Sequence, residues 1–262
     1  MKYFKILLFV LLVVSLISCN FRNTVKDILP RKSFLKVEKS LLLTVCNPKK
    51  PKQCVSKNFG AVASGVVVSN TVGGSYALTA GHVCHDSGTD RVLKRVTKFK
   101  VDFKVADIAG KLYKVEIVSL DQQNDLCLLY VGGLKRPAIH LSTTKPIPGD
   151  RVYNLAAPVG IFDKNMVPLF EGFYNGDSHG GALYSLPAKG GSSGSPIVNH
   201  NGELVGMVSM VFVRFNQICI SPRYEPTINF IKTSIERDVT RRERSTFIKR
   251  MMYLLHINDK KP

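Results

Sequence analysis

Ser193 is the residue of this chain best placed to act as a nucleophile. It lies among glycines in the segment Gly-Gly-Ser-Ser-Gly-Ser-Pro, residues 190–196, just before the apolar pair Ile197 and Val198. Glycine permits a sharp backbone turn, so amide N–H groups beside the serine can point at the oxygen that becomes negative during acyl transfer. The segment therefore predicts an acyl-transfer site at Ser193.

A histidine and an aspartate that would activate this serine lie upstream. A serine hydroxyl is a weak nucleophile at neutral pH and needs a base, which a carboxylate in turn orients. His82 follows the run 75–81, which is typical of a buried strand ending in a small-residue turn. Asp125 precedes the apolar run 126–131, at an edge of the core where it can be desolvated and hydrogen-bonded to an imidazole. Asp121 lacks such a run, and we interpret it as a surface turn residue.

The three motifs, in the order His, Asp, Ser, resemble those of the chymotrypsin-like (trypsin-like) serine peptidases, and especially the peptidase domain of bacterial Deg-type proteases. The resemblance covers about residues 36–237. Its matching stretches are residues 64–68, 78–83, 121–129, 149–152 and 191–206. A serine among glycines is a weak motif by itself, because such variants arise by chance, but three motifs in the family's order are specific.

The resemblance implies a role for each matched residue. Ser193 would attack the scissile carbonyl, His82 would take and return the proton, and Asp125 would hold the imidazole tautomer. The backbone N–H groups of Gly191 and Ser193 would form the oxyanion hole, and Ser209 would support the aspartate. We predict no cofactor and no catalytic metal, because no pair of the other histidines has metal-ligand spacing with cysteines or carboxylates.

The same alignment places a substrate pocket between two short segments. One wall would be Pro187, Ala188 and Lys189, and the other wall would be Met210 and Val211. No acidic residue stands at the base to attract Lys or Arg, and Val211 stands where many relatives have glycine. We therefore expect a preference for small or medium apolar residues at the cleaved position.

Ser192 occupies the position at which animal digestive zymogens carry an aspartate. In those enzymes this aspartate pairs with a newly cut N-terminus. Because serine cannot form that ion pair, we expect a site that assembles without N-terminal cleavage.

Short apolar runs separated by Gly, Pro, Asn and Asp fill residues 36–222 and predict an all-β sandwich or barrel. With the family resemblance, the fold class becomes all-β with two Greek-key β-barrels (chymotrypsin-like), at about residues 36–135 and 145–222. A C-terminal helix at about 226–237 would cap the second barrel. The peptidase domain as a whole would span residues 36–237.

The N-terminus has the layout of a signal peptide. Lys2 and Lys5 precede an apolar run, and Leu-Ile-Ser-Cys at residues 16–19 resembles a bacterial lipobox, which implies lipidation of Cys19. We expect export, with residues 1–18 as signal peptide, residues 19–35 as a basic tether, and anchoring to a membrane on the periplasmic or extracellular side through Cys19. The alternative is an ordinary signal peptide with a chance cysteine and a secreted product.

The net charge of +18 raises the question of nucleic-acid binding. The excess lies at the flanks, because residues 59–222 carry 15 basic and 12 acidic side chains. Aromatic residues are not interleaved with the basic runs in the manner of a nucleic-acid-binding module, so we expect no nucleic-acid partner. Residues 238–262 would form a basic amphipathic tail, with Phe247, Met251 and Leu254 on one face, that binds an anionic membrane surface or a partner. The alternative is that the basic flanks are a solvated surface with no function.

The six cysteines suggest a limited set of disulfides. Cys46 and Cys54 flank a Pro- and Lys-rich loop and are the best candidates for a local bond, which export to an oxidising compartment would permit. We interpret Cys127, inside an apolar strand, as a small buried hydrophobic residue. Cys84 and Cys219 stay undecided between free and paired.

The sequence thus predicts an exported serine endopeptidase that hydrolyses a protein or peptide substrate through an acyl-enzyme intermediate. A protease-like scaffold at a membrane surface, which binds without cleaving, is the alternative. The presence of all three required residue types argues against it, since a scaffold has no need of them. The oligomeric state is not predicted.

Overall fold

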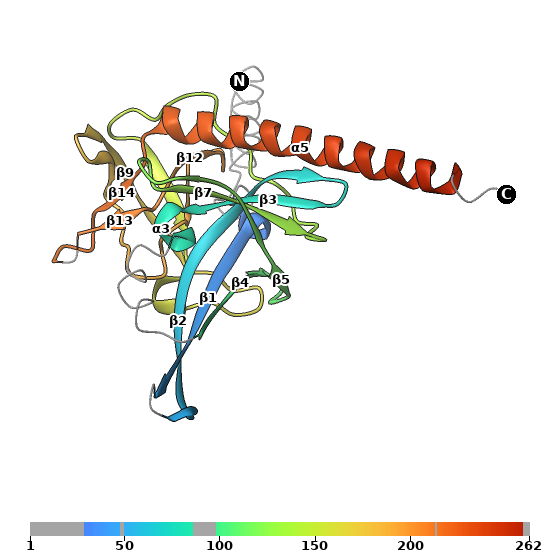
Figure 1. The fold of residues 1–262 in the computed structure, drawn as a ribbon. Coiled ribbons are helices and arrows are strands. Elements are labelled where there is room, and N and C mark those ends of the chain that lie inside the picture. Colours follow the sequence, from blue (N-terminus) through green and yellow to red (C-terminus); the bar gives the residue numbers. More distant parts are fainter. Residues whose placement is uncertain (1–28, 48–49, 86–97, 213, 259–262) are drawn as a thin grey trace, which may run out of the picture.

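The computed structural model describes residues 29–47, 50–85, 98–212 and 214–258, with the backbone alone described beyond residue 246. Its strands form two antiparallel sheets, each of seven strands in the described residues (Figure 1). Both sheets curl into barrels and a C-terminal helix follows them, which confirms the predicted all-β double-barrel fold. The predicted signal peptide, including Cys19, lies outside the described residues.

The first sheet has the strand order β5-β4-β1-β2-β3-β7-β6. Its longest strands, β1 and β2, pair over most of their length and extend beyond the rest of the barrel (Figure 1). The strands are β1 (Phe34–Asn47), β2 (Lys50–Thr71), β3 (Gly74–Ala80), β4 (Lys98–Asp107), β5 (Leu112–Lys114), β6 (Glu116–Asp121) and β7 (Leu126–Gly132). A one-turn helix, α3 (Gly81–Cys84), directly follows β3.

The second sheet has the order β12-β11-β8-β9-β10-β14-β13. Its strands are β8 (Arg151–Leu155), β9 (Leu169–Ser178), β10 (Gly181–Tyr184), β11 (Pro196–Val198), β12 (Leu204–Met207), β13 (Met210–Val211) and β14 (Cys219–Ser221). The loop that contains Ser193 therefore connects β10 to β11.

Each barrel has its own apolar interior, and a third cluster joins the barrels. Val67 and Leu129 lie in the interior of the first barrel, and Ile197 and Val205 lie in that of the second. The joining cluster contains Val66, Leu78, Leu128, Leu204, Met207 and Ile231, so it draws on both sheets and on the C-terminal helix. Burial of this shared surface fixes one barrel against the other.

The C-terminal helix α5 (Tyr224–Asn258) is longer than the predicted helix and projects past the barrels (Figure 1). It does not end near residue 237, because residues 238–258 contain neither Gly nor Pro. Nor does it cap the second barrel alone, since Ile231 packs in the cluster that both barrels share. The side chains of Phe247, Met251 and Leu254 lie outside the described residues. In the part of the chain that the structure describes, no helix has both the length and the apolar character to cross a membrane.

An ion-pair network fastens α5 to the first barrel. Asp238 is buried, binds Arg241 and Arg242, and accepts a hydrogen bond from the Tyr76 hydroxyl at 2.9 Å. Both arginines also bind Glu116 of β6. Burial by itself raises the pKa of Asp238, but the hydrogen bonds from the two arginines and Tyr76 outweigh it and lower that pKa. The buried carboxylate is therefore charged and paired.

Two disulfides are present in the described residues. Cys46 and Cys54 join the ends of β1 and β2, where they pair in register. Cys84 is bonded to Cys127, which corrects the interpretation of Cys127 as a small buried hydrophobic residue. The apolar run around Cys127 indicates burial but carries no signal of its partner, which pairing between β3 and β7 brings close. Cys219 is a buried free thiol.

Candidate active site

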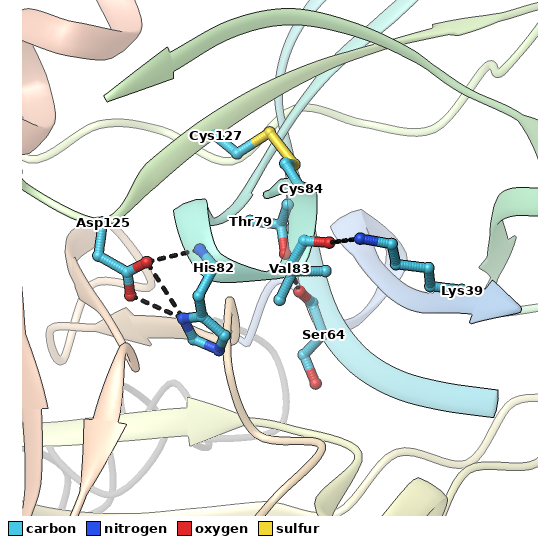
Figure 2. Close-up of a disulfide and its surroundings, with 8 residues drawn as sticks. All are labelled: Lys39, Ser64, Thr79, His82, Val83, Cys84, Asp125 and Cys127. Carbon is cyan, nitrogen blue, oxygen red and sulfur yellow. Dashed lines mark hydrogen bonds and ion pairs between the residues drawn. A yellow bond between two sulfur atoms is a disulfide. The ribbon is translucent and has the colours of Figure 1, made fainter. Parts of the chain in front are cut away.

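His82 and Asp125 lie side by side because β3 and β7 are paired (Figure 2). Ala80 at the end of β3 is opposite Leu126 at the start of β7, so the residues just beyond this pair meet at one barrel edge. His82 Nδ1 lies 2.9 and 3.1 Å from the two carboxylate oxygens of Asp125, and its backbone N–H donates to Oδ1 at 2.7 Å. Two contacts to one carboxylate fix the orientation of the ring.

Gly81 allows this close approach of the two segments. Its N–H donates to the Asp125 carbonyl at 2.9 Å. A Cβ at this position would lie 2.9 Å from the Asp125 carbonyl carbon, closer than such contacts allow. The small residue before His82 is therefore required by packing against the backbone of Asp125.

Ser209 completes the surroundings of the Asp125 carboxylate. It lies between β12 and β13 of the second sheet, is buried, and its hydroxyl donates a short hydrogen bond to Oδ2 of Asp125. Burial by itself raises the pKa of Asp125. The hydrogen bonds from His82 and Ser209 outweigh burial, so the pKa lies below its ordinary value. The carboxylate is therefore ionised at neutral pH and accepts from Nδ1–H of the imidazole. Nε2 is left free to accept a proton.

The loop before Ser193 makes a tight turn over residues 189–192. The Ser192 N–H donates to the Lys189 carbonyl at 2.8 Å, and Gly191, third in the turn, has φ +97°. A positive φ at the third position requires glycine. A Cβ on Gly191 would also lie 2.4 Å from the Ala157 carbonyl oxygen. Gly191 is therefore needed both for the turn and for the close packing against Ala157.

Two carbonyls of this loop accept hydrogen bonds from neighbouring residues. Gly190 O accepts from Val159 N–H at 2.6 Å, and Ser192 O accepts from Ser195 N–H at 2.9 Å. In a trans peptide the N–H points opposite to the C=O, so the N–H groups of Gly191 and Ser193 face the other way. No acceptor for these two N–H groups is found among the described residues. The loop therefore presents two unpaired donors beside the serine.

Ser193 and His82 line one pocket of about 350 Å³. Ser193 is half-buried, and its neighbours Ser192 and Ser195 are fully buried. The other lining residues come largely from the first barrel: Val37, Lys39, Ala61, Val62, Ala63, Val83, His85, Gly190 and Gly191. The structure thus brings together all the residues for which the sequence predicted catalytic, oxyanion or supporting roles.

The five predicted substrate-pocket residues do not line this pocket. Pro187, Ala188 and Lys189 precede the turn, and Ala188 is buried with its N–H bonded to the carbonyl of Asn216. Met210 and Val211 form β13. Met210 lines a second, more polar pocket of about 250 Å³ together with Asp125 and Ser209. The two predicted walls therefore stand on either side of the Ser193 loop in sequence, and neither of these two pockets joins them.

Sequence reasoning missed two features of the site. Ser64 of β2 is fully buried and contacts the Ser193 loop. Residues 64–68 belong to the matching family pattern, but the sequence assigned Ser64 no role. The Cys84–Cys127 disulfide joins the segments that carry His82 and Asp125 (Figure 2). The equal spacing of each cysteine, two residues after His82 or Asp125, was a usable signal for the second feature.

A family model described as a trypsin-like peptidase domain matches residues 63–207 of this chain. Among curated proteins, a "Probable periplasmic serine endoprotease DegP-like" of Pseudomonas putida (strain W619) is 27% identical over 173 residues. The match covers 64% of this chain and 33% of that protein. The chain thus spans about a third of the length of the curated relatives it matches.

Solved structures support the same fold. The serine endoprotease from Yersinia pestis superposes with a TM-score of 0.59 at 18% identity, covering 83% of this chain and 68% of the other. The HtrA-type protease AlgW with a decapeptide gives a TM-score of 0.61 at 17% identity, covering 81% and 67%. At these identities the likeness concerns the double-barrel fold.

Proposed function

The chain belongs to the trypsin-like peptidase family, and from this membership we propose that it is a serine endopeptidase that uses Ser193, His82 and Asp125 as a catalytic triad. One observation carries the proposal. His82 shares a pocket with Ser193 while its Nδ1 is held by the Asp125 carboxylate. A protease-like scaffold without activity has no comparable support.

The reaction follows from the polarity of this arrangement. Ser193 Oγ forms a bond to the carbonyl carbon of the scissile peptide, and its proton passes to Nε2 of His82. The Asp125 carboxylate stabilises the resulting imidazolium, while the free N–H groups of Gly191 and Ser193 stabilise the oxyanion. His82 then gives the proton to the amine as the C–N bond breaks, which leaves an acyl-enzyme. Water, activated by His82, attacks this ester, and the acid is released as Ser193 regains its proton.

The site is proposed to be assembled without N-terminal cleavage. Ser192 is fully buried, and its hydroxyl accepts a hydrogen bond from the Lys189 N–H at 3.3 Å. A neutral hydroxyl with a local partner needs no incoming ammonium group. Purified full-length protein is expected to be active as isolated, and a requirement for a specific N-terminal cut would contradict this part of the proposal.

Labelling with a fluorophosphonate probe tests the nucleophile directly. We expect the parent protein to be labelled and the Ser193→Ala variant to stay unlabelled. Ser178→Ala is a suitable control, because Ser178 ends β9 and bonds locally to the Gly181 carbonyl. A folded parent that takes no label would refute the peptidase and favour the scaffold.

Export is proposed from the relatives and from the cysteines. The curated relatives are described as periplasmic, and both disulfides suit an oxidising compartment. We further propose anchoring through a lipidated Cys19 and binding of the basic tail to an anionic membrane surface. Cys19→Ser should release the protein from membrane fractions. Deletion of residues 245–262, which keeps Arg241 and Arg242 on Asp238, should weaken binding to anionic vesicles. Unchanged membrane association in both variants would exclude these routes.

The proposed substrate preference is for small or medium apolar residues at the cleaved position. It rests on Val211, which would narrow the pocket, and on the absence of an acidic residue at the proposed base. A peptide-library profile measures this preference. Dominant cleavage after Arg or Lys would contradict it.

A further inference from the structure

Ser64 links the two barrels at the candidate site. It lies on β2 of the first sheet (Figure 2), is fully buried, and contacts both the Ser193 loop and Ala157. Its hydroxyl donates to the Gly191 carbonyl at 2.8 Å and accepts from the Ala157 N–H at 3.0 Å. Its backbone N–H donates to the Ser193 carbonyl at 2.8 Å. One residue of the first barrel therefore holds the carbonyls on both sides of the Ser192–Ser193 peptide.

These bonds complete the fixation of the loop. The peptide from Gly191 to Ser192 is held at its C=O by Ser64 and at its N–H by Lys189. The peptide from Ser193 to Gly194 is held at its C=O by Ser64 and at its N–H by the Val208 carbonyl. The Ser193 N–H belongs to the peptide between these two fixed planes, so Ser64 limits its direction from both sides. The Gly191 N–H belongs to the peptide just before the first plane, and the C=O of that peptide is held by Val159, so Ser64 limits its direction from one side.

The surroundings leave little room for the loop to adjust without this contact. A Cβ on Gly194 would lie 2.1 Å from the Ser64 carbonyl oxygen. That same oxygen accepts from the Thr79 hydroxyl at 2.8 Å, which holds β2 against β3 just before the His82 segment (Figure 2). Loss of the Ser64 hydroxyl would leave the Gly191 carbonyl and the Ala157 N–H buried without a partner.

We propose that Ser64 is a positioning residue that aims the Gly191 and Ser193 N–H groups at the oxyanion. The inference rests on the proposed peptidase function and adds to it a residue of the opposite barrel. Ser64 acts through the loop and does not touch substrate. It therefore affects the step in which the oxyanion forms and leaves substrate binding unchanged.

The test compares Ser64→Ala with Ser75→Ala in the full-length protein. Ser75 is matched because it too is fully buried in the first barrel, with its hydroxyl 2.7 and 2.8 Å from two oxygen acceptors. We expect Ser64→Ala to lower kcat for a peptide substrate by about 10- to 100-fold with KM within about twofold, since loss of a whole oxyanion donor costs 10²- to 10³-fold. The kcat of Ser64→Cys, which keeps a weak donor, should lie between that of Ser64→Ala and that of the parent. Equal kcat in Ser64→Ala and Ser75→Ala would overturn the inference.

A second readout separates this inference from the proposed function. Amide hydrogen exchange at Ser192 and Gly194 should be about tenfold faster in Ser64→Ala than in the parent, and unchanged in Ser75→Ala. This measurement does not require activity. A parent that takes no fluorophosphonate would refute the peptidase, whereas unchanged exchange in Ser64→Ala would refute the fixation of the loop.

Discussion

The segments that carry His82 and Asp125 bind each other within the first barrel. The loop that carries Ser193 is instead held by hydrogen bonds from residues outside the two strands that it connects. The first region has paired strands, a direct hydrogen bond from His82 and the Cys84–Cys127 disulfide. The second has a glycine turn whose carbonyls are held by Val159 and by Ser64 of the opposite barrel.

The difference separates two kinds of dependence. The histidine and the aspartate keep their geometry as long as β3 and β7 are paired, because nearly all of their contacts come from these strands and the turns beside them. Ser209, from the second sheet, is the exception. The serine loop takes part of its hydrogen bonds from Ser64 of the first barrel, so its geometry also depends on the docking of the two barrels. We therefore expect the loop to be the first part of the site to respond when the barrel interface is weakened.

Removal of the base should have the largest effect on activity. His82→Ala is expected to lower kcat by about 10⁶-fold, because a serine without a base is a poor nucleophile. Peptide hydrolysis under saturating substrate measures this. The control is His140→Ala, whose side chain is exposed before the second barrel and should change kcat by less than about twofold. Substantial activity in His82→Ala would place the base elsewhere.

The two disulfides should differ in their contribution to stability. Loop-closure entropy predicts a loss of about 4 kcal/mol for Cys84→Ala with Cys127→Ala, whose sequence separation is 43, against about 2.5 kcal/mol for Cys46→Ala with Cys54→Ala, whose separation is 8. Urea unfolding of both double variants measures the two values. The first pair should also lower activity, because it joins the His82 and Asp125 segments. Equal effects on activity would show that hydrogen bonds alone hold these segments.

Distortion of the serine loop should cost less than loss of the base. Gly191→Ala would place a Cβ 2.4 Å from the Ala157 carbonyl oxygen at a φ of +97°, so the turn must open. We expect kcat to fall by about 10²- to 10³-fold, as for loss of an oxyanion donor. Gly190→Ala is the matched control, since its Cβ would meet nothing within 4 Å. Similar losses in both variants would indicate that the whole segment, and not the Gly191 turn, is critical.

Loss of Ser209 should have the smallest effect, and it should depend on pH. The pKa of Asp125 is lowered below its ordinary value of 3.8, so its charged form stabilises the fold above that pH, and this contribution disappears as pH falls through the folded pKa. Ser209→Ala removes one lowering hydrogen bond and raises the pKa of Asp125. The deficit in unfolding free energy should be full at neutral pH and shrink below about pH 4. A deficit that is independent of pH would assign Ser209 to packing alone.

The apolar runs and the motif order were enough to predict much of this molecule. Short runs with Gly and Pro between them predicted strands, and the resemblance carried by residues such as His82 and Ser193 predicted the double barrel. The length of α5 was underestimated. Residues beyond 237 are mostly basic and polar, so the apolar spacing that indicates a helix is weak there, although the run contains no helix breaker. The partner of Cys127 was missed because a disulfide depends on distance in space, which an apolar run does not report.

The sequence by itself determined which residues carry the chemistry, because a nucleophile, a base, a carboxylate and glycines for a turn are properties of residue types and their order. Only the tertiary structure decided how they are held: Ser209 and Ser64 each reach across the barrel boundary, and Cys84 finds Cys127 through strand pairing. The physical reason is that a hydroxyl or a thiol has no defined partner along the chain, and docking of the two barrels supplies the distance and direction that a hydrogen bond requires.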